Sequence, residues 1–476
     1  MDTWLSKSEN GSMSSLRHPE EWIQFLTEGE EFRPFAPPLA SGEGFGTEVI
    51  AGFAKVGTKT VGIFANDVRV DQGYVTSSGA LKIRRLQERC RELGIPMIGL
   101  LSSPGVSISE GVASGEDYSA VLMGHCELSG VIPQIACVMG ANIGATAYSA
   151  TLMDLTLFQK ARSYLCVSGP GVVAEMLGQE TTYAELGGAA LHASKTGIAH
   201  FVDSSAENQL RRARWFIDFF PSNYLEDPPR REPAEPTTPF PEIPSAPEVA
   251  FDVTGVISAL VDRSEWIEYS SEFGRSMVTA FARLDGRPIG VIASQSLHLA
   301  GALDCDAAEK CARFIRVCDS YGIPLLSLVD SPGFMPGVQE ESKGLLRKGA
   351  LLCQAMKTRS PKVSVTLRKC YGAAAIVLSQ TRKWRGDLHL SLDSARTAVM
   401  GYHAAKRVVF KDRKESDEIL KAEYLAKYEA PEIAYRLGFI DQIVAPADLR
   451  ATLVFHFDLL SRKRENRSEP VRGIFP

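Results

Sequence analysis

The chain has 476 residues, of which 45% are hydrophobic and 23% are charged, and its formal net charge is −5. At roughly 100–200 residues per domain, this length suggests two or three domains with buried cores. The composition argues against a disordered chain, and the charge gives no global basic excess for nucleic-acid binding.

Signals for a membrane, for secretion and for structural metals are weak. No apolar run of about 18 residues is present, so we expect no membrane span. The polar N-terminal region lacks the apolar core of a signal peptide. The nine cysteines contain no CxxC pair, which argues against a zinc ribbon and a disulfide framework. We therefore expect a cytoplasmic protein without a metal site.

The first patterned region, residues 44–226, alternates helix, strand and glycine-bearing loop. Residues 80–93 are amphipathic at helical spacing, and Gly94 is placed to end the predicted helix in the left-handed conformation. Short apolar runs at 97–101 and 131–139 predict buried strands. The loops that follow these strands lie at 103–106 and 140–146.

A proline-rich stretch, residues 227–247, follows this region. Eight of its 21 residues are proline, which fixes φ and removes the backbone donor. The stretch is therefore predicted to be an extended, stiff connector. It divides the chain into an N-terminal segment at 1–43, a domain at 44–226, the connector, and a second domain at 248–476.

The second half repeats the first at a constant offset of 228 residues, from Cys90 and Cys318 to Gly144 and Gly372. An ungapped offset over some fifty residues predicts the duplication of one structural unit with alternating helices and strands, an α/β core. The elements predicted for this half are a helix at 307–321, strands at 325–329 and 363–367, and glycine-bearing loops at 331–337 and 371–374.

The loops are the candidate chemical sites. Each half has two, at matching positions after apolar strands, and such loops can aim backbone N–H groups at one point and stabilise an enolate or another oxyanion. A plain tight turn explains any single loop, whereas the duplicated pair of pairs favours function. The candidate catalytic residues are Gly105, Val106, Gly144, Ala145, Gly333, Phe334, Gly372 and Ala373.

Several motifs resemble one enzyme family. They are the run Val329–Gly337 (VDSPGFMPG), the run 344–350 (GLLRKGA), the Arg368-Lys369-Cys370-Tyr371-Gly372 run, Ala398–Gly401, and in the first half Glu110-Gly111, 129–134, Tyr148-Ser149, 185–189, His192 and 197–200. Together they are similar to carboxyltransferase (beta) subunits of biotin-dependent acyl-CoA carboxylases, of the propionyl-CoA carboxylase type. The resemblance runs from about residue 44 to residue 444.

This resemblance implies a fold of two duplicated crotonase-like domains (ClpP/crotonase superfamily). It implies that acyl-CoA binds the N-terminal domain and carboxybiotin the C-terminal domain, and that CO2 passes to the α-carbon of the thioester through an enolate. The biotin is expected on a separate carrier protein, with a separate biotin carboxylase chain, and no metal is expected in this chain. The expected assembly is a homo-oligomer, from dimer to hexamer, in which N- and C-terminal domains of different subunits face each other.

Departures from the family pattern cluster at the predicted site. The family loop Asp-Ser-Gly-Gly-Ala-Arg is Ser102–Ser107 here, with Pro104 unable to donate a hydrogen bond. The family pair Gly-Gly becomes Gly144-Ala145, and Tyr-Gly-Gly-Ala-Tyr-Asp becomes 371–376. Because alanine keeps its N–H, both oxyanion holes are expected to survive. The candidate substrate-binding residues are Tyr148, Tyr371, Ala375 and Ile376.

Two alternatives remain beside carboxyl transfer. One is a biotin-independent enzyme that forms a thioester enolate, such as a decarboxylase or a C–C or acyl-transfer enzyme of specialised metabolism. The other is a non-catalytic scaffold that assembles with an active paralogue. The sequence leaves open which acyl group is used and whether CoA or a carrier protein delivers the thioester. An Ala355-Met356-Lys357 run is similar to a biotinylation site but ends a predicted helix, so we do not expect it to be one.

Overall fold

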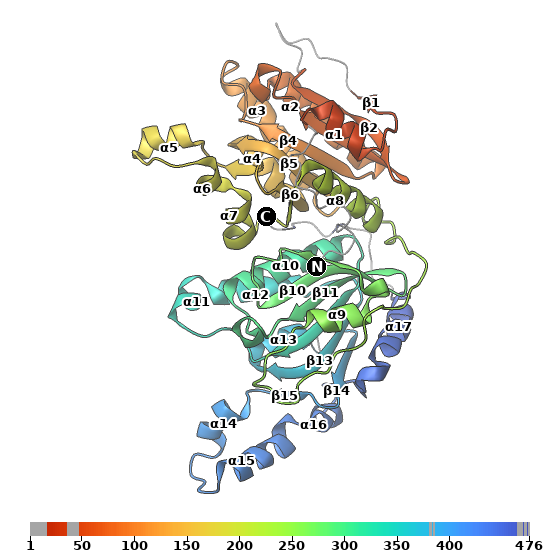
Figure 1. Cartoon of the computed structure of the whole chain (residues 1–476), viewed down its shortest axis with the longest axis vertical. Coiled ribbons are helices and arrows are strands. Elements are labelled where there is room, and N and C mark those ends of the chain that lie inside the picture. The colour runs from red at the N-terminus through yellow and green to blue at the C-terminus, as the bar shows by residue number, and fades with distance from the viewer. Residues whose placement is uncertain are drawn as a thin grey trace. The chain divides into compact units, whose positions relative to one another are not determined.

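The computed structural model describes residues 17–35, 47–379, 383, 386–463, 470 and 474. The chain divides into two compact units, one reaching Pro229 and the other beginning at Arg230 (Figure 1). Of the predicted N-terminal segment 1–43 the structure describes residues 17–35, which contain a helix and a short strand. None of the described helices combines the length and the apolar character needed to cross a membrane.

The N-terminal unit is built on a mixed sheet. Its strands are β1 (Arg33–Pro34), β2 (Val49–Val56), β3 (Lys59–Asn66), β4 (Met97–Ser103), β5 (Gln134–Ile143), β6 (Leu155–Gln159), β7 (Tyr164–Cys166) and β8 (Phe201–Asp203). The order is β1-β2-β3-β4-β5-β6-β8, with β7 beside the end of β5. β1, β2 and β3 pair antiparallel, and the remaining pairs are parallel. The helices are α1 (Pro19–Leu26), α2 (Ser77–Leu93), α3 (Val112–Leu128), α4 (Ala145–Leu152), α5 (Pro170–Leu177), α6 (Tyr183–Gly187), α7 (Ala189–Leu191) and α8 (Ala206–Phe219).

The C-terminal unit has the same plan. Its strands are β9 (Trp266–Tyr269), β10 (Met277–Leu284), β11 (Arg287–Ser294), β12 (Leu325–Ser331), β13 (Lys362–Tyr371), β14 (Leu388–Leu392), β15 (Arg396–Ala398) and β16 (Gln442–Val444). The order is β9-β10-β11-β12-β13-β14-β16, with β15 beside the end of β13. The helices are α9 (Thr254–Leu260), α10 (Cys305–Ser320), α11 (Val338–Ser342), α12 (Leu345–Ala355), α13 (Gly372–Ser379), α14 (Tyr402–Val409), α15 (Asp417–Tyr424), α16 (Pro431–Arg436) and α17 (Leu449–Leu460).

The duplication predicted from the sequence is confirmed element by element. Adding 228 to the bounds of β2, β3, β4 and β5 gives the bounds of β10, β11, β12 and β13. The glycine that ends the helix before β4 or β12 is left-handed in both units, with φ of 63° at Gly94 and 66° at Gly322. The two sheets therefore present equivalent strand ends, and these ends carry the candidate site.

The predicted bounds of the strand at 131–139 and of the loop at 140–146 are wrong. The strand expected at 131–139 starts later, at Gln134, and continues through Gly140 to Ile143. A side chain at Gly140 would lie 2.3 Å from the Ser102 hydroxyl, so this glycine permits two neighbouring strands to approach rather than forming a loop. Only Gly144 turns the chain, with φ 64° and ψ −129°, before α4 begins.

The proline-rich stretch packs along the C-terminal unit. Residues 227–247 contain neither helix nor strand, consistent with their proline content. The Arg231 N–H donates to Gly286 O at 2.9 Å, and Arg450 Nη2 donates to Ala234 O at 2.7 Å. Phe240 and Ile243 pack against the core of the C-terminal unit. The connector is thus held by hydrogen bonds and by apolar contacts.

Candidate active site

In the N-terminal unit, the loop after β4 holds its shape through the Ser103 hydroxyl. This hydroxyl donates to Gly73 O at 2.7 Å and accepts from the Gly105 N–H at 3.2 Å. Gly105 O then accepts from the Val75 N–H, and the Ser107 N–H donates to Val75 O. In this parallel bridge Val106 points its own N–H away from Val75. No acceptor in the described part of the chain lies within hydrogen-bonding range of that N–H.

The second loop supplies the N-terminus of α4. Gly144 has φ 64°, which a residue with a side chain rarely adopts, and Ala145 opens the helix. N–H groups in the first turn of a helix have no intrahelical acceptor. Thr146 Oγ1 donates to Ser103 O at 3.1 Å, so the α4 terminus is tied to the end of β4. The N–H groups of Val106 and Ala145 thus lie on two adjoining, hydrogen-bonded loops.

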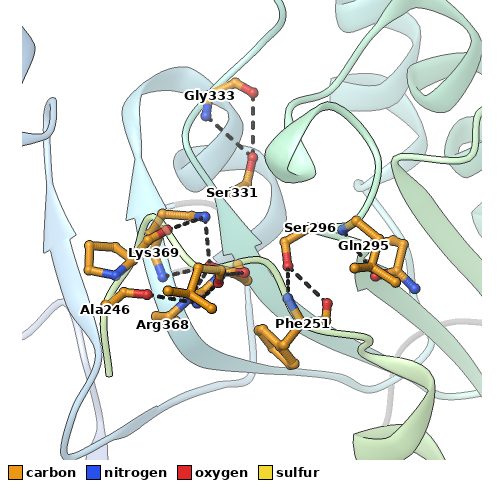
Figure 2. Close-up of polar contacts among 12 residues, drawn as sticks. Ala246, Phe251, Gln295, Ser296, Ser331, Gly333, Arg368 and Lys369 are labelled. Carbon is orange, nitrogen blue, oxygen red and sulfur yellow. Dashed lines mark hydrogen bonds and ion pairs between the residues drawn. The ribbon is translucent and has the colours of Figure 1, made fainter. Parts of the chain in front are cut away.

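The C-terminal unit repeats this arrangement with the same backbone angles. Figure 2 shows Ser331 and Gly333, whose N–H donates to Ser331 Oγ at 3.3 Å. The φ values of Gly333 and Gly105 are 134° and 129°, and those of Gly372 and Gly144 are both 64°. Leu303 bridges Phe334 as Val75 bridges Val106. Of the eight candidate catalytic residues, Gly105, Gly144 and Gly333 use their N–H groups internally, and the candidate donors are the N–H groups of Val106, Ala145, Phe334 and Ala373.

A carboxylate fixes the outer end of each first loop, and the sequence pattern alone assigned it no role. The Ser77 N–H at the start of α2 donates to Glu110 Oε2 at 2.6 Å. In the C-terminal unit, the Cys305 N–H at the start of α10 donates to Glu340 Oε2 at 2.8 Å. A negative charge is favourable at a helix N-terminus, so each contact anchors a loop to a rigid helix. Glu110 was visible only as part of a family motif.

A buried group of charges lies behind the C-terminal loops. Asp330, directly before Ser331, pairs with Arg368 and Lys369, which precede Tyr371 by three and two residues. All three side chains are buried. These residues belong to motifs that carry the family resemblance, but nothing in the local sequence pairs them, because the carboxylate and the cations come from different strands.

The candidate substrate-binding residues on α4 and α13 differ in burial, and those on α13 are the candidate wall of the site in the C-terminal unit. Tyr148 and Ile376 occupy equivalent positions on α4 and α13, and they are 50% and 56% exposed within the chain. Ile376 therefore does not fill the core. Ala375 is buried beside it and keeps the wall small at that point. Both exposed side chains lie one turn beyond the N-terminus of the helix that carries the candidate donor.

Tyr371 is buried, and its phenol faces inward. Its side chain lies near that of Glu429, and a Cβ on Gly401 would lie 3.0 Å from its ring. Burial raises the pKa of Tyr371 well above its usual range, and the negative charge of Glu429 adds to this effect. Burial likewise raises the pKa of Glu429, which accepts from the Tyr402 N–H at 3.0 Å. The structure thus places Tyr371 as a support under the turn at Gly372.

The histidines of the N-terminal motifs have structural partners. His192 contacts Leu165 O through Nε2 and Thr196 Oγ1 through Nδ1, both at 2.8 Å, and burial lowers its pKa. His200 Nδ1 accepts from the Thr156 N–H at 3.0 Å. Lys357 follows a buried Met356 at the end of α12 rather than standing on an exposed hairpin. In the described residues no three metal-ligating side chains come together.

Comparisons with a family model and with curated relatives point to the same protein family. The carboxyl transferase domain family matches residues 39–107 and 79–475. The carboxyltransferase subunit of propionyl-CoA carboxylase from Haloferax mediterranei is 36% identical, over 90% of this chain and 86% of that protein. The alpha subunit of methylmalonyl-CoA decarboxylase from Veillonella parvula is 33% identical, over 90% of this chain and 86% of its own.

A solved structure agrees with these relatives. The transcarboxylase 12S structure with bound methylmalonyl-coenzyme A superposes with a TM-score of 0.90 at 30% identity, and it covers 97% of this chain and 92% of its own. The two units are therefore crotonase-like domains, as the resemblance implied. The match of the family across almost the whole chain confirms the family resemblance of the sequence motifs, and the chain belongs to the carboxyl transferase domain family as an acyl-CoA carboxyltransferase.

Proposed function

We propose that this chain transfers a carboxyl group between carboxybiotin and the α-carbon of an acyl-CoA thioester. In that exchange the α-carbon loses a proton and gains the carboxyl group, and the biotin ureido nitrogen supplies the carboxyl group and takes up the proton. The observation that carries the proposal is the duplicated pair of loops, each presenting N–H groups free of internal acceptors at Val106 and Phe334.

The chain's own contribution is electrostatic. The N–H groups of Val106 and Ala145 hold the oxygen of a thioester as it becomes an enolate oxyanion. The N–H groups of Phe334 and Ala373 hold the carbonyl oxygen of biotin in the same way. Removal of one such donor typically costs about 100- to 1,000-fold in kcat. The glycines at 144 and 372 set the angle at which the helix N-terminus approaches the oxygen, and their φ of 64° accounts for their identity.

Oligomerisation is part of the proposal. α5 has no side chain buried within the chain, although it is largely apolar, and Met176 and Leu177 are 76% and 72% exposed. An apolar helix left open in this way is typical of a protein interface. We propose an active unit of at least two chains, in which Gly144 of one chain faces Gly372 of the partner subunit. Sedimentation of a stable, fully active monomer would contradict it.

The partners follow from the reaction. A biotin carrier with its biotin carboxylase and an acyl thioester on CoA or on a carrier protein are proposed for this chain, and a cytoplasmic location stays a prediction. In the decisive experiment, the protein is incubated with labelled bicarbonate, ATP, a cognate biotin carboxylase with its carrier, and each of a panel of acyl-CoAs. Labelled product that depends on the carrier supports the proposal, and equal product without biotin refutes it.

A second candidate is carboxyl removal rather than addition. It is favoured by the 33% identical relative named as a methylmalonyl-CoA decarboxylase subunit. The same amides would hold the same enolate, since both directions pass through it. The two candidates separate on the direction of flux: incubation with methylmalonyl-CoA and free biotin carrier yields propionyl-CoA at a higher kcat than the forward reaction only if removal is the working direction.

A further inference from the structure

The buried charges behind the C-terminal loops connect three separate segments. Asp330 lies near the end of β12 and accepts from Arg368 Nε at 3.2 Å, from Arg368 Nη2 at 2.8 Å and from the Lys369 N–H at 3.1 Å. Lys369 Nζ lies 3.5 Å from Asp330 Oδ1. Arg368 and Lys369 belong to β13, so one carboxylate joins the strand that leads to Ser331 with the strand that leads to Gly372.

The charges do not balance within this group, because two cations meet one carboxylate. Buried cations need hydrogen-bond acceptors, and the end of the connector supplies them as neutral carbonyls. Arg368 Nη1 donates to Ala246 O at 3.0 Å and also to Val249 O, and Lys369 Nζ donates to Pro247 O at 3.1 Å. Figure 2 shows the bond from Arg368 to Ala246, with Lys369 beside them.

Phe251 and Asp252, which follow the connector, are held in place as well. The Arg368 guanidinium lies 4.9 Å from the ring centre of Phe251. The Phe251 N–H donates to Ser296 Oγ at 3.0 Å, and the same hydroxyl donates back to Phe251 O at 2.9 Å. Gln295 Nε2 donates to Asp252 at 2.7 Å. Residues 246–252 are therefore held by β13 and by the two residues that follow β11, next to the candidate site.

The fold does not require this cluster. The residues at equivalent positions in the N-terminal unit are Ser102, Gly140 and Ala141, which carry no charge, yet the loops there adopt the same backbone angles. A buried ion pair is also weak evidence for stability, because its desolvation cost offsets its attraction. A role in the local site accounts better for three buried charges than a role in folding.

We propose that Arg368 and Lys369 are positioning residues that lock both loops of the C-terminal oxyanion hole to each other and to residues 246–252, which are the end of the connector and the five residues after it. The inference rests on the proposed function of those loops. The connector is then a structural part of the site on the C-terminal unit.

The test compares Arg368→Met and Lys369→Met with a matched control, Arg450→Met. Arg450 also holds the connector from a largely buried ion pair, donating to Asp262 at 2.9 Å and to Ala234 O, but it touches neither loop. Hydrogen–deuterium exchange of the full-length protein is read in peptides covering 246–252, 329–337 and 366–376. Arg368→Met is expected to speed exchange at least tenfold in all three, and Arg450→Met in none of them.

Kinetics with propionyl-CoA and the biotin carrier provide the second readout. A loop displaced by about 1 Å is expected to lower kcat on the order of 100-fold. The KM for propionyl-CoA is expected to change less than about threefold, because the CoA part of that thioester is assigned to the other unit. If Arg368→Met does not fold, Lys369→Met is expected to show faster exchange confined to 246–252 and 366–376.

The outcomes separate the two proposals. Wild-type exchange rates in peptides 329–337 and 366–376 of both variants would overturn the positioning role, whatever the activity. Faster exchange in the variants of a protein that transfers no carboxyl group even as wild type would keep the positioning role and refute the proposed function. Equal effects of Arg450→Met on the same peptides would also overturn the inference.

Discussion

The two units reach the same loop geometry by different means. In the N-terminal unit the loops are joined by hydroxyls, since Ser103 Oγ bonds to Gly73 O and Thr146 Oγ1 bonds to Ser103 O. In the C-terminal unit the position of Thr146 is taken by Ala374, and the Asp330 carboxylate joins the strands instead. The glycine φ values agree to within 5° all the same. Backbone geometry is therefore the shared requirement, and the side chains that hold it are free to diverge.

The largest expected effect on stability comes from removing the Asp330 carboxylate in the C-terminal unit. Asp330→Ala leaves Arg368 and Lys369 buried without their anion, which should cost about 3–5 kcal/mol of unfolding free energy. The matched change Ser102→Ala in the N-terminal unit should cost less than about 1 kcal/mol, because it removes one hydroxyl. Urea unfolding of both variants by circular dichroism measures the difference. Equal losses would remove the distinction between the two units.

Acid should weaken the N-terminal unit through His125. Burial lowers the pKa of His125 from 6.5 to about 4. The unfolded chain takes up a proton as the pH falls below 6.5, whereas the folded unit stays neutral until about pH 4. Stability from this group is thus complete above pH 6.5 and is lost between 6.5 and 4, by about 3 kcal/mol in total.

The check for this pH effect is His125→Asn, which retains a partner for the Gln134 side chain that His125 contacts at 2.8 Å. Its unfolding free energy should fall less steeply between pH 6.5 and 4 than that of the wild type. His403→Asn is the control, because the His403 side chain is 74% exposed. A control that flattens the pH profile as much as His125→Asn would contradict the assignment.

Substrate choice should depend on Ile376 more than on its counterpart Tyr148. The family resemblance implies that Ile376 replaces an aspartate, and Ile376 makes this part of the candidate substrate site apolar and, with Ala375, small. We expect an acyl chain longer or bulkier than propionyl, since a pocket discriminates by about 1–3 kcal/mol per methylene. Ile376→Asp should shift kcat/KM toward propionyl-CoA, and Tyr148→Phe should not.

The measurement is kcat/KM for acetyl-, propionyl-, butyryl- and longer acyl-CoAs. A wild-type preference for acetyl-CoA would show that the apolar wall does not select long chains. An unchanged order of preference in Ile376→Asp would show that Ile376 does not set the choice of acyl group.

The smallest effect is expected at the hydroxyl that joins the N-terminal loops. Thr146→Val keeps the side-chain shape and removes the bonds to Ser103 O at 3.1 Å and Ile143 O at 3.0 Å. The loss should be about 1 kcal/mol of unfolding free energy. Thermal unfolding of the variant beside Thr151→Val, whose hydroxyl bonds Tyr148 O on the exposed side of α4, gives the comparison. A loss as large as that of Asp330→Ala would mean that hydroxyls hold the loops as firmly as charges.

Local sequence signals predicted much of the fold and the positions of the loops that form the candidate site. The offset of 228 and the glycines after apolar strands identified the duplicated unit and its loops, because helix ends and turns depend on nearby residues. The continuation of β5 through Gly140 was missed, since the side chain that requires glycine there is Ser102 on a neighbouring strand. The bonds from Arg368 to Ala246 and Val249 span 122 and 119 residues of chain, and no local pattern predicts such a pairing.

Glu110 and Glu340, the carboxylates at the N-termini of α2 and α10, show where this fold can accept changes in loop sequence. Glu110 follows Ser103 by seven residues, whereas Glu340 follows Ser331 by nine, and both still reach the first N–H of the helix. The offset of 228 still holds at β5 and β13, so the chain length is unchanged and the anchoring carboxylate itself lies two residues further along in the C-terminal unit. The Met335 N–H donates to Leu303 O and holds the bridge at Phe334, so the stretch in which a designer can graft or lengthen a loop and leave the candidate donors in place is 336–339.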